Sequence, residues 1–428
     1  MKKEELLLSL RTHEFKSLLS ERLGIAPDEC DGEIARIERA IAGFDEMFGK
    51  DRDLRVFSVG GRSEISGNHT DHNGGKAITA AVNISVIAVA AARDDGTIRI
   101  KSEGYDVDTV TKDDLLSPHP EYFGKSFALI AGCRNAFSEF GLHTGGLDAF
   151  TVSSVPAGSG LSSSAAFEVA VCKMLSSFYN EDRVDEITLA KAARYAENKY
   201  FGKPCGLMDQ AACAVGGFAV FDFSSPVPRV KKLDIDLSEK GFVLCITDTG
   251  GDHCDLTAEY AAIPSEMKKV ASFFKKNTLS EVGSETAILE NITALRKYCN
   301  DRAVLRALHF FDENERVEKI EKALVAGDMA SFLRLVSSSG NSSFKYLQNV
   351  TADISHDRSL SLALYLSEKF FETHVGAARV HGGGFAGTVQ AFVKKEDATE
   401  YKNYVERFFG EGSCRILRVR TAGSERLF

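Results

Sequence analysis

The sequence has no Cys-x-x-Cys pair, although it contains nine cysteines scattered between Cys30 and Cys414. A zinc ribbon or a redox dithiol requires closely spaced cysteines, and a disulfide framework requires an even set at regular spacings. An odd, dispersed set argues against both. The cysteine pattern therefore predicts a protein of a reducing compartment.

Long apolar runs are also missing. The longest apolar tract, residues 77–92, is interrupted by Thr79, Asn83 and Ser85, so it is too polar and too short to span a bilayer. The apolar stretch near the N-terminus is cut short before it reaches the length of a signal peptide, by Arg11 and Glu14. We therefore expect a cytoplasmic protein that makes no membrane contact.

Runs of lysine and arginine are absent, and the formal net charge is -9. Nucleic-acid binding requires a basic face, which this balance does not supply. The composition, with 44% hydrophobic and 26% charged residues, is that of a soluble globular protein. It fits a soluble protein, expected as a monomer.

A chain of 428 residues exceeds one average core and predicts two domains. We place the boundary at the Ser- and Pro-containing segment 224–228, which gives an N-terminal domain of residues 1–224 and a C-terminal domain of residues 225–428. Apolar periodicity predicts helices and strands in both halves, without internal repeats. The expected fold class is α+β, in two lobes with a cleft between them.

The expected elements follow from these periodicities. Helical spacing covers much of residues 1–50, 122–140, 189–200 and 255–375, including 304–311 and 320–335. Strand patterns cover residues 55–59, 82–89, 97–102, 217–223, 242–247, 388–393 and 415–420. Residues 61–75, between the first two of these strands, are expected to form a loop.

One stretch, Val155-Pro156-Ala157-Gly158-Ser159-Gly160-Leu161-Ser162-Ser163-Ser164 and the Ala-rich residues that follow to position 170, joins a strand end, a loop of small residues and a helix start. We call residues 155–170 the phosphate loop. Its glycines let backbone approach a ligand, and a serine at the helix cap would open a helix whose free N–H groups favour an anion. A serine-rich capped loop without a ligand is the alternative.

Two familiar phosphate motifs fail on particular residues of this loop. A P-loop requires Gly-Lys-Ser/Thr, whereas Gly160 is followed by Leu161 and Ser162. A dinucleotide fingerprint requires a third glycine where the chain has Ser163. Because the loop has no lysine, positive charge must come from amides, a helix end and a metal ion.

Two further stretches accompany the loop. Residues 61–75, Gly-Arg-Ser-Glu-Ile-Ser-Gly-Asn-His-Thr-Asp-His-Asn-Gly-Gly, are called the sugar signature here, and residues 380–387, Val-His-Gly-Gly-Gly-Phe-Ala-Gly, the third motif. Together the three stretches resemble the motifs of the galactokinase branch of the galactose, homoserine, mevalonate and phosphomevalonate kinase superfamily. They stand in the family order and extend over most of the chain.

The resemblance implies ATP-dependent phosphorylation of the anomeric hydroxyl of galactose. Asp209, in Cys-Gly-Leu-Met-Asp-Gln, would accept the hydroxyl proton, and Arg62 beside it would stabilise the transition state and lower the aspartate pKa. Ser164 and Glu197 match the family's Mg²⁺ ligands, a hydroxyl and a carboxylate. The ATP-binding residues would be Gly158, Ser159, Gly160, Leu161, Ser162, Ser163 and Ser164.

Each assignment has a plainer alternative. Asp209 could cap a helix, Arg62 could form a surface ion pair, and Glu197 could pair with Lys199 or Arg194 along a helix. The match of the surrounding residues favours the catalytic roles.

The sugar would be bound by Asn68, His69, Thr70, Asp71 and Tyr260. Short polar side chains on a tight loop suit a polyhydroxy ligand. A metal site at His69, Asp71 and His72 is the less favoured interpretation.

Three departures from the family pattern concern the identity of the sugar. The usual Glu before His-Thr-Asp is Asn68, the usual Pro-Gly-Arg is Gly60-Gly61-Arg62, and the basic residues that commonly follow Tyr260 are absent. The resemblance implies that the family's Glu at this position contacts the sugar near its 6-hydroxyl. Because Asn68 has no charge, we expect looser selection at C6 of the sugar and tolerance of galacturonate. A kinase for galacturonate, a pentose or N-acetylgalactosamine therefore stays open. A non-catalytic regulator that binds galactose and ATP is a further alternative, although the uninterrupted serine-alanine run of residues 162–166 favours an enzyme.

Overall fold

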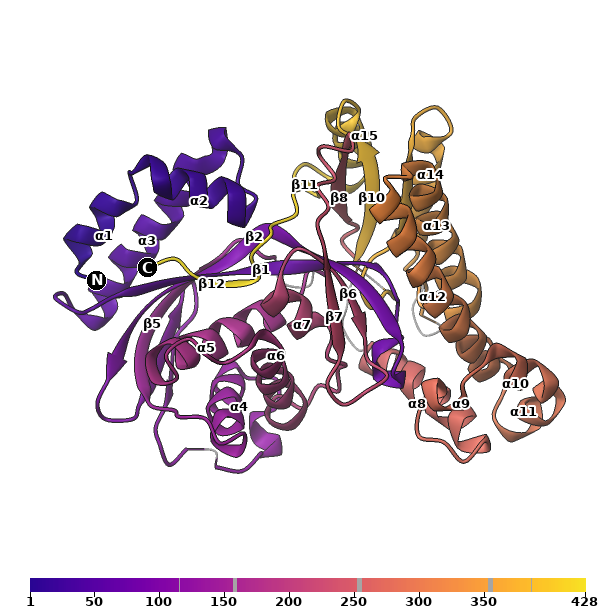
Figure 1. Ribbon diagram of the computed structural model, residues 1–428, viewed down its shortest axis with the longest axis horizontal. Helices are drawn as coiled ribbons and strands as arrows, with labels where there is room; N and C mark the ends of the chain where they lie inside the picture. The colour runs from indigo at the N-terminus through magenta and orange to yellow at the C-terminus, as the bar shows by residue number, and fades with distance from the viewer. Residues whose placement is uncertain (115, 157–159, 252–255, 353–356, 386) are drawn as a thin grey trace.

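The computed structural model describes residues 1–114, 116–156, 160–251, 256–352, 357–385 and 387–428. Its elements form two β-sheets with helices packed against them (Figure 1). The fold is α+β, as the sequence predicts. Among the described residues, we find no helix with both the length and the apolar character that a bilayer crossing requires.

The larger sheet has the strand order β12-β1-β2-β5-β3-β4, and β6 and β7 extend it from β2. All its strand pairs are antiparallel except β3 with β5. Its strands are β1 (Arg55–Ser66), β2 (Lys76–Arg93), β3 (Ile98–Ser102), β4 (Val107–Val110), β5 (Gly146–Ser153), β6 (Phe218–Asp222), β7 (Arg229–Leu233) and β12 (Ser424–Arg426).

Helices cover both faces of this sheet. Side chains of a strand alternate between faces, so Val56 packs with the N-terminal helices while Phe57 and Val59 pack with the later ones. The N-terminal layer consists of α1 (Lys3–Ser9), α2 (His13–Leu23), η1 (Pro27–Glu29) and α3 (Cys30–Phe48). The opposite layer consists of η3 (Pro120–Tyr122), α4 (Ser126–Glu139), α5 (Ser163–Tyr179), α6 (Glu186–Tyr195), the π-helical η4 (Ala196–Tyr200) and α7 (Met208–Val215).

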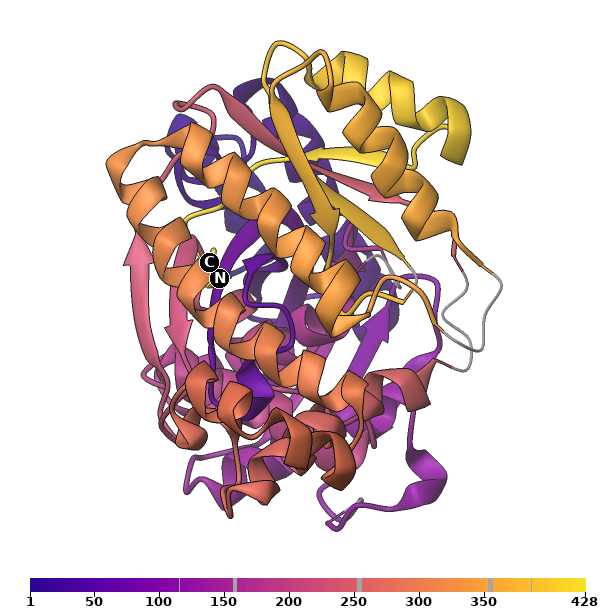
Figure 2. The ribbon, with the colours of Figure 1, turned by 90° about the vertical axis from the view of Figure 1, so that its right-hand side faces the viewer.

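The smaller sheet is antiparallel, with the order β11-β8-β10-β9. Its strands are β8 (Phe242–Asp248), β9 (Gly376–Val380), β10 (Thr388–Lys394) and β11 (Cys414–Leu417). Two long helices, α12 and α13, run together beside it (Figure 2), and Phe332 of α13 packs edge-on against Phe392 of β10. The helices of this half are α8 (Thr257–Phe273), α9 (Leu279–Val282), α10 (Glu285–Glu290), α11 (Ile292–Tyr298), α12 (Asp301–Ala326), α13 (Met329–Ser342), the π-helical η5 (Ser343–Leu347), α14 (Ser359–Phe371) and α15 (Ala398–Phe409).

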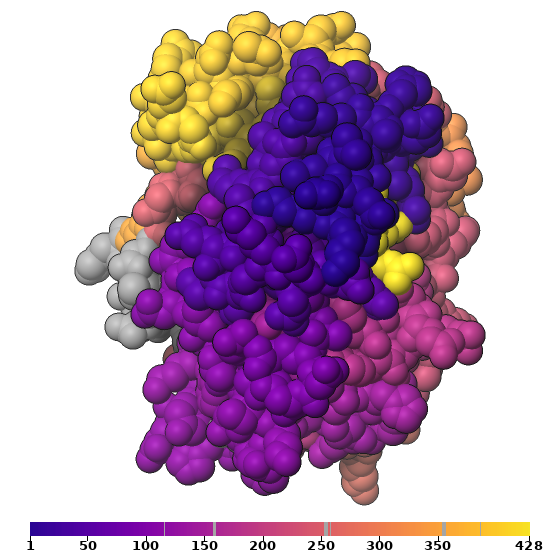
Figure 3. Space-filling model, turned by 90° about the vertical axis from the view of Figure 1, so that its left-hand side faces the viewer, coloured from indigo at the N-terminus to yellow at the C-terminus, as the bar shows by residue number. Residues whose placement is uncertain are grey.

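Two strands of the larger sheet come from residues after the segment 224–228, where we placed the domain boundary. β7 pairs with β6, and the C-terminal β12 returns to pair with β1, so both belong to the larger sheet although they follow residue 224. The last residues lie against the N-terminal helices (Figure 3), where Phe428 stacks near Phe15 with ring centroids 5.0 Å apart. The division into residues 1–224 and 225–428 stays a prediction.

Most expected elements occur close to their predicted ranges, but the sugar signature does not lie wholly on a loop. Its first part, through Ser66, continues β1, and the loop with the short η2 (Asp71–Asn73) begins only at Gly67. β1 stays paired with β2 over this stretch, although the pairing register shifts twice, at Gly60/Arg62 and at Glu64/Ser66. Between the two shifts the pairing is regular, so Arg62 and Glu64 lie on the same face of β1.

Candidate active site

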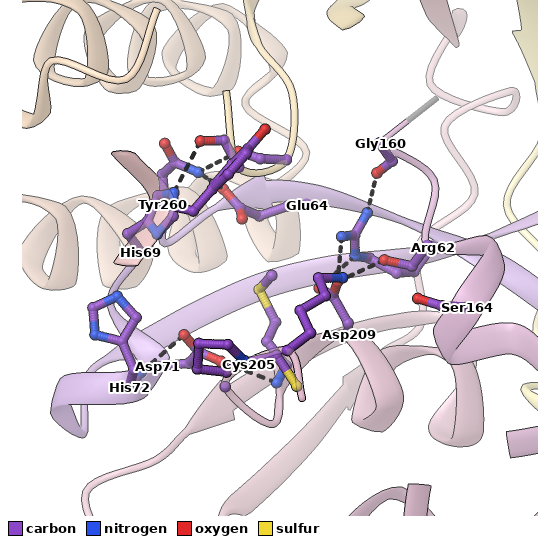
Figure 4. Close-up of a pocket in the computed structure, with 18 of the residues that line it drawn as sticks. Arg62, Glu64, His69, Asp71, His72, Gly160, Ser164, Cys205, Asp209 and Tyr260 are labelled. Carbon is purple, nitrogen blue, oxygen red and sulfur yellow. Dashed lines mark hydrogen bonds and ion pairs between the residues drawn. The ribbon is translucent and has the colours of Figure 1, made fainter. Parts of the chain in front are cut away.

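A cavity of about 460 Å³ lies where the phosphate loop, the sugar signature, the third motif and the start of α7 meet (Figure 4). It is lined from both halves of the chain. Of the residues predicted from sequence, its lining includes Arg62, Asn68, His69, Asp71, Gly160, Ser162, Ser163, Ser164, Asp209 and Tyr260.

The remaining predicted residues lie apart from this lining. Glu197 is buried next to Ser164, Leu161 is buried in the apolar core, and the Thr70 hydroxyl donates to the carbonyls of Gly67 and Lys76. Gly158 and Ser159 lie outside the described residues.

Arg62 and Asp209 form a two-point ion pair at the centre of the cavity. Arg62 Nε donates to Asp209 Oδ1 at 2.8 Å, and Nη2 donates to Oδ2 at 2.7 Å. The third nitrogen, Nη1, donates to the carbonyl of Gly160 in the phosphate loop, so Arg62 lies between that loop and Asp209 (Figure 4). The guanidinium therefore places a fixed positive charge between the phosphate loop and Asp209.

Gly61 allows this placement. A Cβ there would lie 2.8 Å from the carbonyl oxygen of Leu161, which also accepts a hydrogen bond from Arg62 N. Only glycine lets β1 and the phosphate loop approach so closely.

The Asp209 carboxylate is held in its ionised form. Burial would raise its pKa, but the charge and hydrogen bonds of Arg62, together with Ser162, lower the pKa to about 2. This confirms the expected effect of Arg62 on the aspartate.

Ser162 differs from its expected role. It precedes α5 in a left-handed conformation, with φ 58°, and its side chain makes no capping hydrogen bond. Instead its hydroxyl donates to Asp209 Oδ2 at 2.6 Å. The first N–H groups of α5 thus stay available to an anion beside the ion pair.

Glu197, in η4, is surrounded by polar groups. Ser164 Oγ lies 3.3 Å from Glu197 Oε1, Lys203 Nζ lies 2.9 Å from the same oxygen, and Gln210 Nε2 donates to Oε2 at 2.6 Å. Burial and the charge of Glu197 raise the pKa of the neighbouring Glu168 well above its usual range.

A hydroxyl and a carboxylate oxygen in contact are ligands that suit Mg²⁺, which keeps further oxygens from water and nucleotide. Within the described ranges, no group of three or more His, Cys, Asp or Glu side chains is arranged to hold a metal. Ser164 Oγ and Glu197 Oε1 thus offer two protein oxygens to such an ion.

Asp71 holds the loop of the sugar signature in place through hydrogen bonds within the signature and to the start of α7. Asp71 accepts from the backbone N–H of His72 at 2.8 Å and of Met208 at 3.2 Å. A Cβ on Gly206 would lie 1.6 Å from Asp71 Oδ2, so Gly206 is what lets this carboxylate reach the start of α7. Burial raises the Asp71 pKa and lowers the His69 pKa to about 4, so His69 is neutral near neutral pH.

Among the titratable lining residues, Glu64, Lys203 and Cys205 were not singled out from the sequence, and His72 entered only in the less favoured metal interpretation. Lys203 supplies a cation that the phosphate loop lacks, and it comes from the Gly-Lys-Pro segment six residues before Asp209. Its nearness to Asp209 in sequence was the available signal. For Glu64 the signal was its position two residues after Arg62.

Comparison with known proteins places this architecture in a class. The model of the GHMP kinases N terminal domain matches residues 128–217, which contain the phosphate loop and Asp209, and the galactokinase galactose-binding signature matches residues 42–92. The fold is shared with mevalonate kinase at a TM-score of 0.58 and 16% identity, with 85% of this chain and 98% of the other covered. The protein is thus a kinase of the GHMP type.

Its relatives narrow the class. A galactokinase of Streptomyces coelicolor is 30% identical over 402 residues, covering 91% of this chain and 99% of the relative, and a galactokinase of Lactobacillus helveticus is 29% identical, covering 83% and 89%. The structure of Lactococcus lactis galactokinase complexed with galactose matches at a TM-score of 0.78 and 23% identity, covering 90% and 98%. The chain belongs to the galactokinase family.

Proposed function

We propose that the protein transfers the γ-phosphoryl group of ATP to the anomeric hydroxyl of galactose, giving galactose 1-phosphate and ADP. The observation that carries this proposal is the ion pair of Arg62 and Asp209, held between the phosphate loop and the sugar signature in one cavity. A phosphoryl transfer requires positioning and charge stabilisation more than covalent chemistry. This cavity offers both.

Each group has a role that its surroundings support. The ionised Asp209 orients the anomeric hydroxyl and accepts its proton. Arg62 and the N–H groups at the start of α5 stabilise the negative charge that grows on the phosphoryl oxygens. Lys203, which lines the same cavity, adds further positive charge there.

Mg²⁺ would be held by Ser164 and Glu197, where it would neutralise charge on the nucleotide phosphates. Gln210 orients the Glu197 carboxylate by donating to Oε2. Lys203 Nζ donates to Oε1 of the same carboxylate, so a positive charge lies beside Glu197.

The direct test is a coupled ADP-release assay over free sugars: galactose, glucose, galacturonate, N-acetylgalactosamine and arabinose. We expect galactose to give the highest kcat/KM and glucose to be a poor substrate, because a site that hydrogen-bonds a hydroxyl rejects the epimer. If none of these sugars causes ADP release although galactose and ATP still bind, the protein is a regulator and not a kinase. A higher kcat/KM for another sugar would replace galactose in the proposal.

Metal dependence provides a prediction. Ser164→Ala and Glu197→Gln should each raise the Mg²⁺ concentration for half-maximal rate severalfold, because each removes an oxygen ligand or its charge. Ser138→Ala and Glu186→Gln, at exposed helix positions, are the matched controls, and they should leave this concentration unchanged. If the Mg²⁺ dependence of both test variants equals that of the unmodified protein, the ion is held elsewhere.

The pKa of Asp209 provides another prediction. A carboxyl with a pKa of about 2 stays ionised as the pH falls from 8 to 5, so kcat at saturating galactose and ATP should show no acid limb from Asp209 in that interval. A loss of kcat with a midpoint near pH 6, at constant Tm and saturation, would contradict the ionised state assigned to Asp209. The rate at saturation is the right quantity because KM also reflects other titrating groups.

A further inference from the structure

The side chain of Asn68, the residue that departs most from the family pattern, is fully buried. Its Nδ2 donates to Glu64 Oε1 at 2.9 Å and to the Gly382 carbonyl at 2.7 Å. Its Oδ1 accepts from Asn349 Nδ2 at 2.7 Å and from Ser343 Oγ at 3.3 Å. An amide has two N–H donors and two acceptor lone pairs, so all of its hydrogen-bonding capacity is used by the protein.

These bonds belong to a set that fixes the third motif against the sugar signature. The carbonyl of Gly382 accepts from Asn68, that of Gly383 lies 3.0 Å from both His69 Nε2 and Asn349 Nδ2, and that of Gly384 accepts from Tyr260 at 2.7 Å. A carboxylate at position 68 would have no hydrogen to donate to Gly382. Asn68 is therefore suited to positioning this loop.

Glu64 accepts a hydrogen bond from Asn68, and Figure 4 shows Glu64 in the lining of the cavity. It projects from β1, two residues after Arg62, and its Oε1 accepts from both Asn68 Nδ2 and Arg379 Nη2, the latter at 3.2 Å. Among the described residues, no hydrogen bond is made to Oε2. One carboxylate oxygen is thus anchored, and the other is left to a ligand.

We infer that Glu64, and not residue 68, presents the carboxylate that accepts a hydrogen bond from a hydroxyl of the sugar, while Asn68 positions Glu64 and the third motif. This inference rests on the proposed function for the nature of the ligand. It names a neutral sugar with a free hydroxyl as the preferred substrate class. A sugar carboxylate facing Glu64 would meet a like charge, so galacturonate should be a poor substrate, contrary to the expectation from Asn68 alone.

The surroundings of Glu64 support the assignment. Burial raises its pKa to about 7, although Arg379 and Arg62 act in the opposite direction. At pH 8 the group is ionised, and a buried carboxylate with one free oxygen is a strong acceptor. All measurements below are therefore made at pH 8.

The main test is calorimetric titration of galactose and of its 2-, 3-, 4- and 6-deoxy analogues into the unmodified protein and into Glu64→Gln. We expect Glu64→Gln to weaken galactose binding on the order of tenfold to a hundredfold, the effect of removing a charged acceptor. For the one analogue that lacks the hydroxyl bound by Glu64, the variant should bind as well as the unmodified protein. Glu33→Gln, which removes a buried carboxylate paired with Arg36, is the control and should not change sugar binding.

Two results would overturn the inference: unchanged galactose affinity in Glu64→Gln, or an equal loss for all five sugars. Because binding is measured without ATP, it is independent of turnover. A protein that binds galactose through Glu64 but releases no ADP would contradict the proposed function and leave this inference supported. A protein that binds no galactose would overturn both.

Asn68→Asp and the double variant Glu64→Gln, Asn68→Asp separate positioning from sugar binding. Asn68→Asp places two carboxylates in contact, so we expect a lower Tm and weaker galactose binding. The double variant removes one of the two charges, so its Tm should recover in part, but its galactose affinity should stay as low as that of Glu64→Gln. If affinity recovers together with Tm, Glu64 has only a structural role.

Discussion

Replacing Asp209 with asparagine should lower kcat by about a hundredfold to ten thousandfold, the range observed when a general base is removed. Asparagine keeps the shape of the side chain, but it cannot take the anomeric proton or supply the charge that faces Arg62. The Asp209 side chain is 31% exposed, toward the cavity, so the fold does not depend on burying it. We therefore expect ATP affinity and Tm to stay close to those of the unmodified protein.

The measurement is steady-state kinetics with ADP release, together with calorimetric ATP binding and thermal unfolding. Asp222→Asn is the matched control, because Asp222 also pairs with an arginine, Arg229, but on the surface. That variant should keep its kcat. Turnover of Asp209→Asn within a fewfold of the unmodified protein would remove Asp209 from the catalytic role.

Much of the site could be predicted because its residues cluster within short motifs. Arg62, Asp71, Ser164 and Asp209 each occur in a stretch whose local residues imply a loop, a cap or a ligand, and the structure brings these stretches together. The N-terminal helices were also predictable, since their apolar residues repeat with helical spacing over the whole of α3.

What could not be predicted depends on contacts between residues far apart in the chain. Asn68 meets Asn349 across 281 positions, and Asn349 belongs to none of the three motifs. Because the sequence does not reveal this contact, an amide at position 68 is interpreted from the sequence as a group that faces the sugar. The same holds for Ser162, whose cap position is local but whose partner, Asp209, lies 47 residues away.

The extension of β1 through the sugar signature was missed for a different reason. Gly60 and Gly61 predict a turn, because glycine favours turns locally. In the structure, Gly61 instead allows close approach to Leu161, and the two register shifts with β2 absorb the irregularity. Tertiary packing thus overrides the local preference.

Replacing Arg62 should also have a large effect on turnover, because the three nitrogens of its guanidinium make three separate contacts. Nε and Nη2 hold both oxygens of Asp209, and Nη1 holds the phosphate loop at Gly160. A lysine has a single charged nitrogen and cannot reproduce this planar arrangement. We expect Arg62→Lys to lower kcat by about a hundredfold to a thousandfold, comparable to the loss of one preorganised donor to the transition state.

Arg62→Ala should lower kcat further than Arg62→Lys, and it should also change the pH dependence of kcat. Without the guanidinium, burial is left to act on Asp209, so its pKa should rise from about 2, and an acid limb should appear in kcat at a higher pH. Added guanidinium ion should restore part of the rate of Arg62→Ala, and it should not improve Asp209→Asn. Arg296→Lys is the control, because Arg296 makes the same two-point contact with Asp301 on the surface. If Arg62→Ala keeps the pH profile of the unmodified protein and is not rescued, Arg62 acts on the fold of the cavity and not on the charge of Asp209.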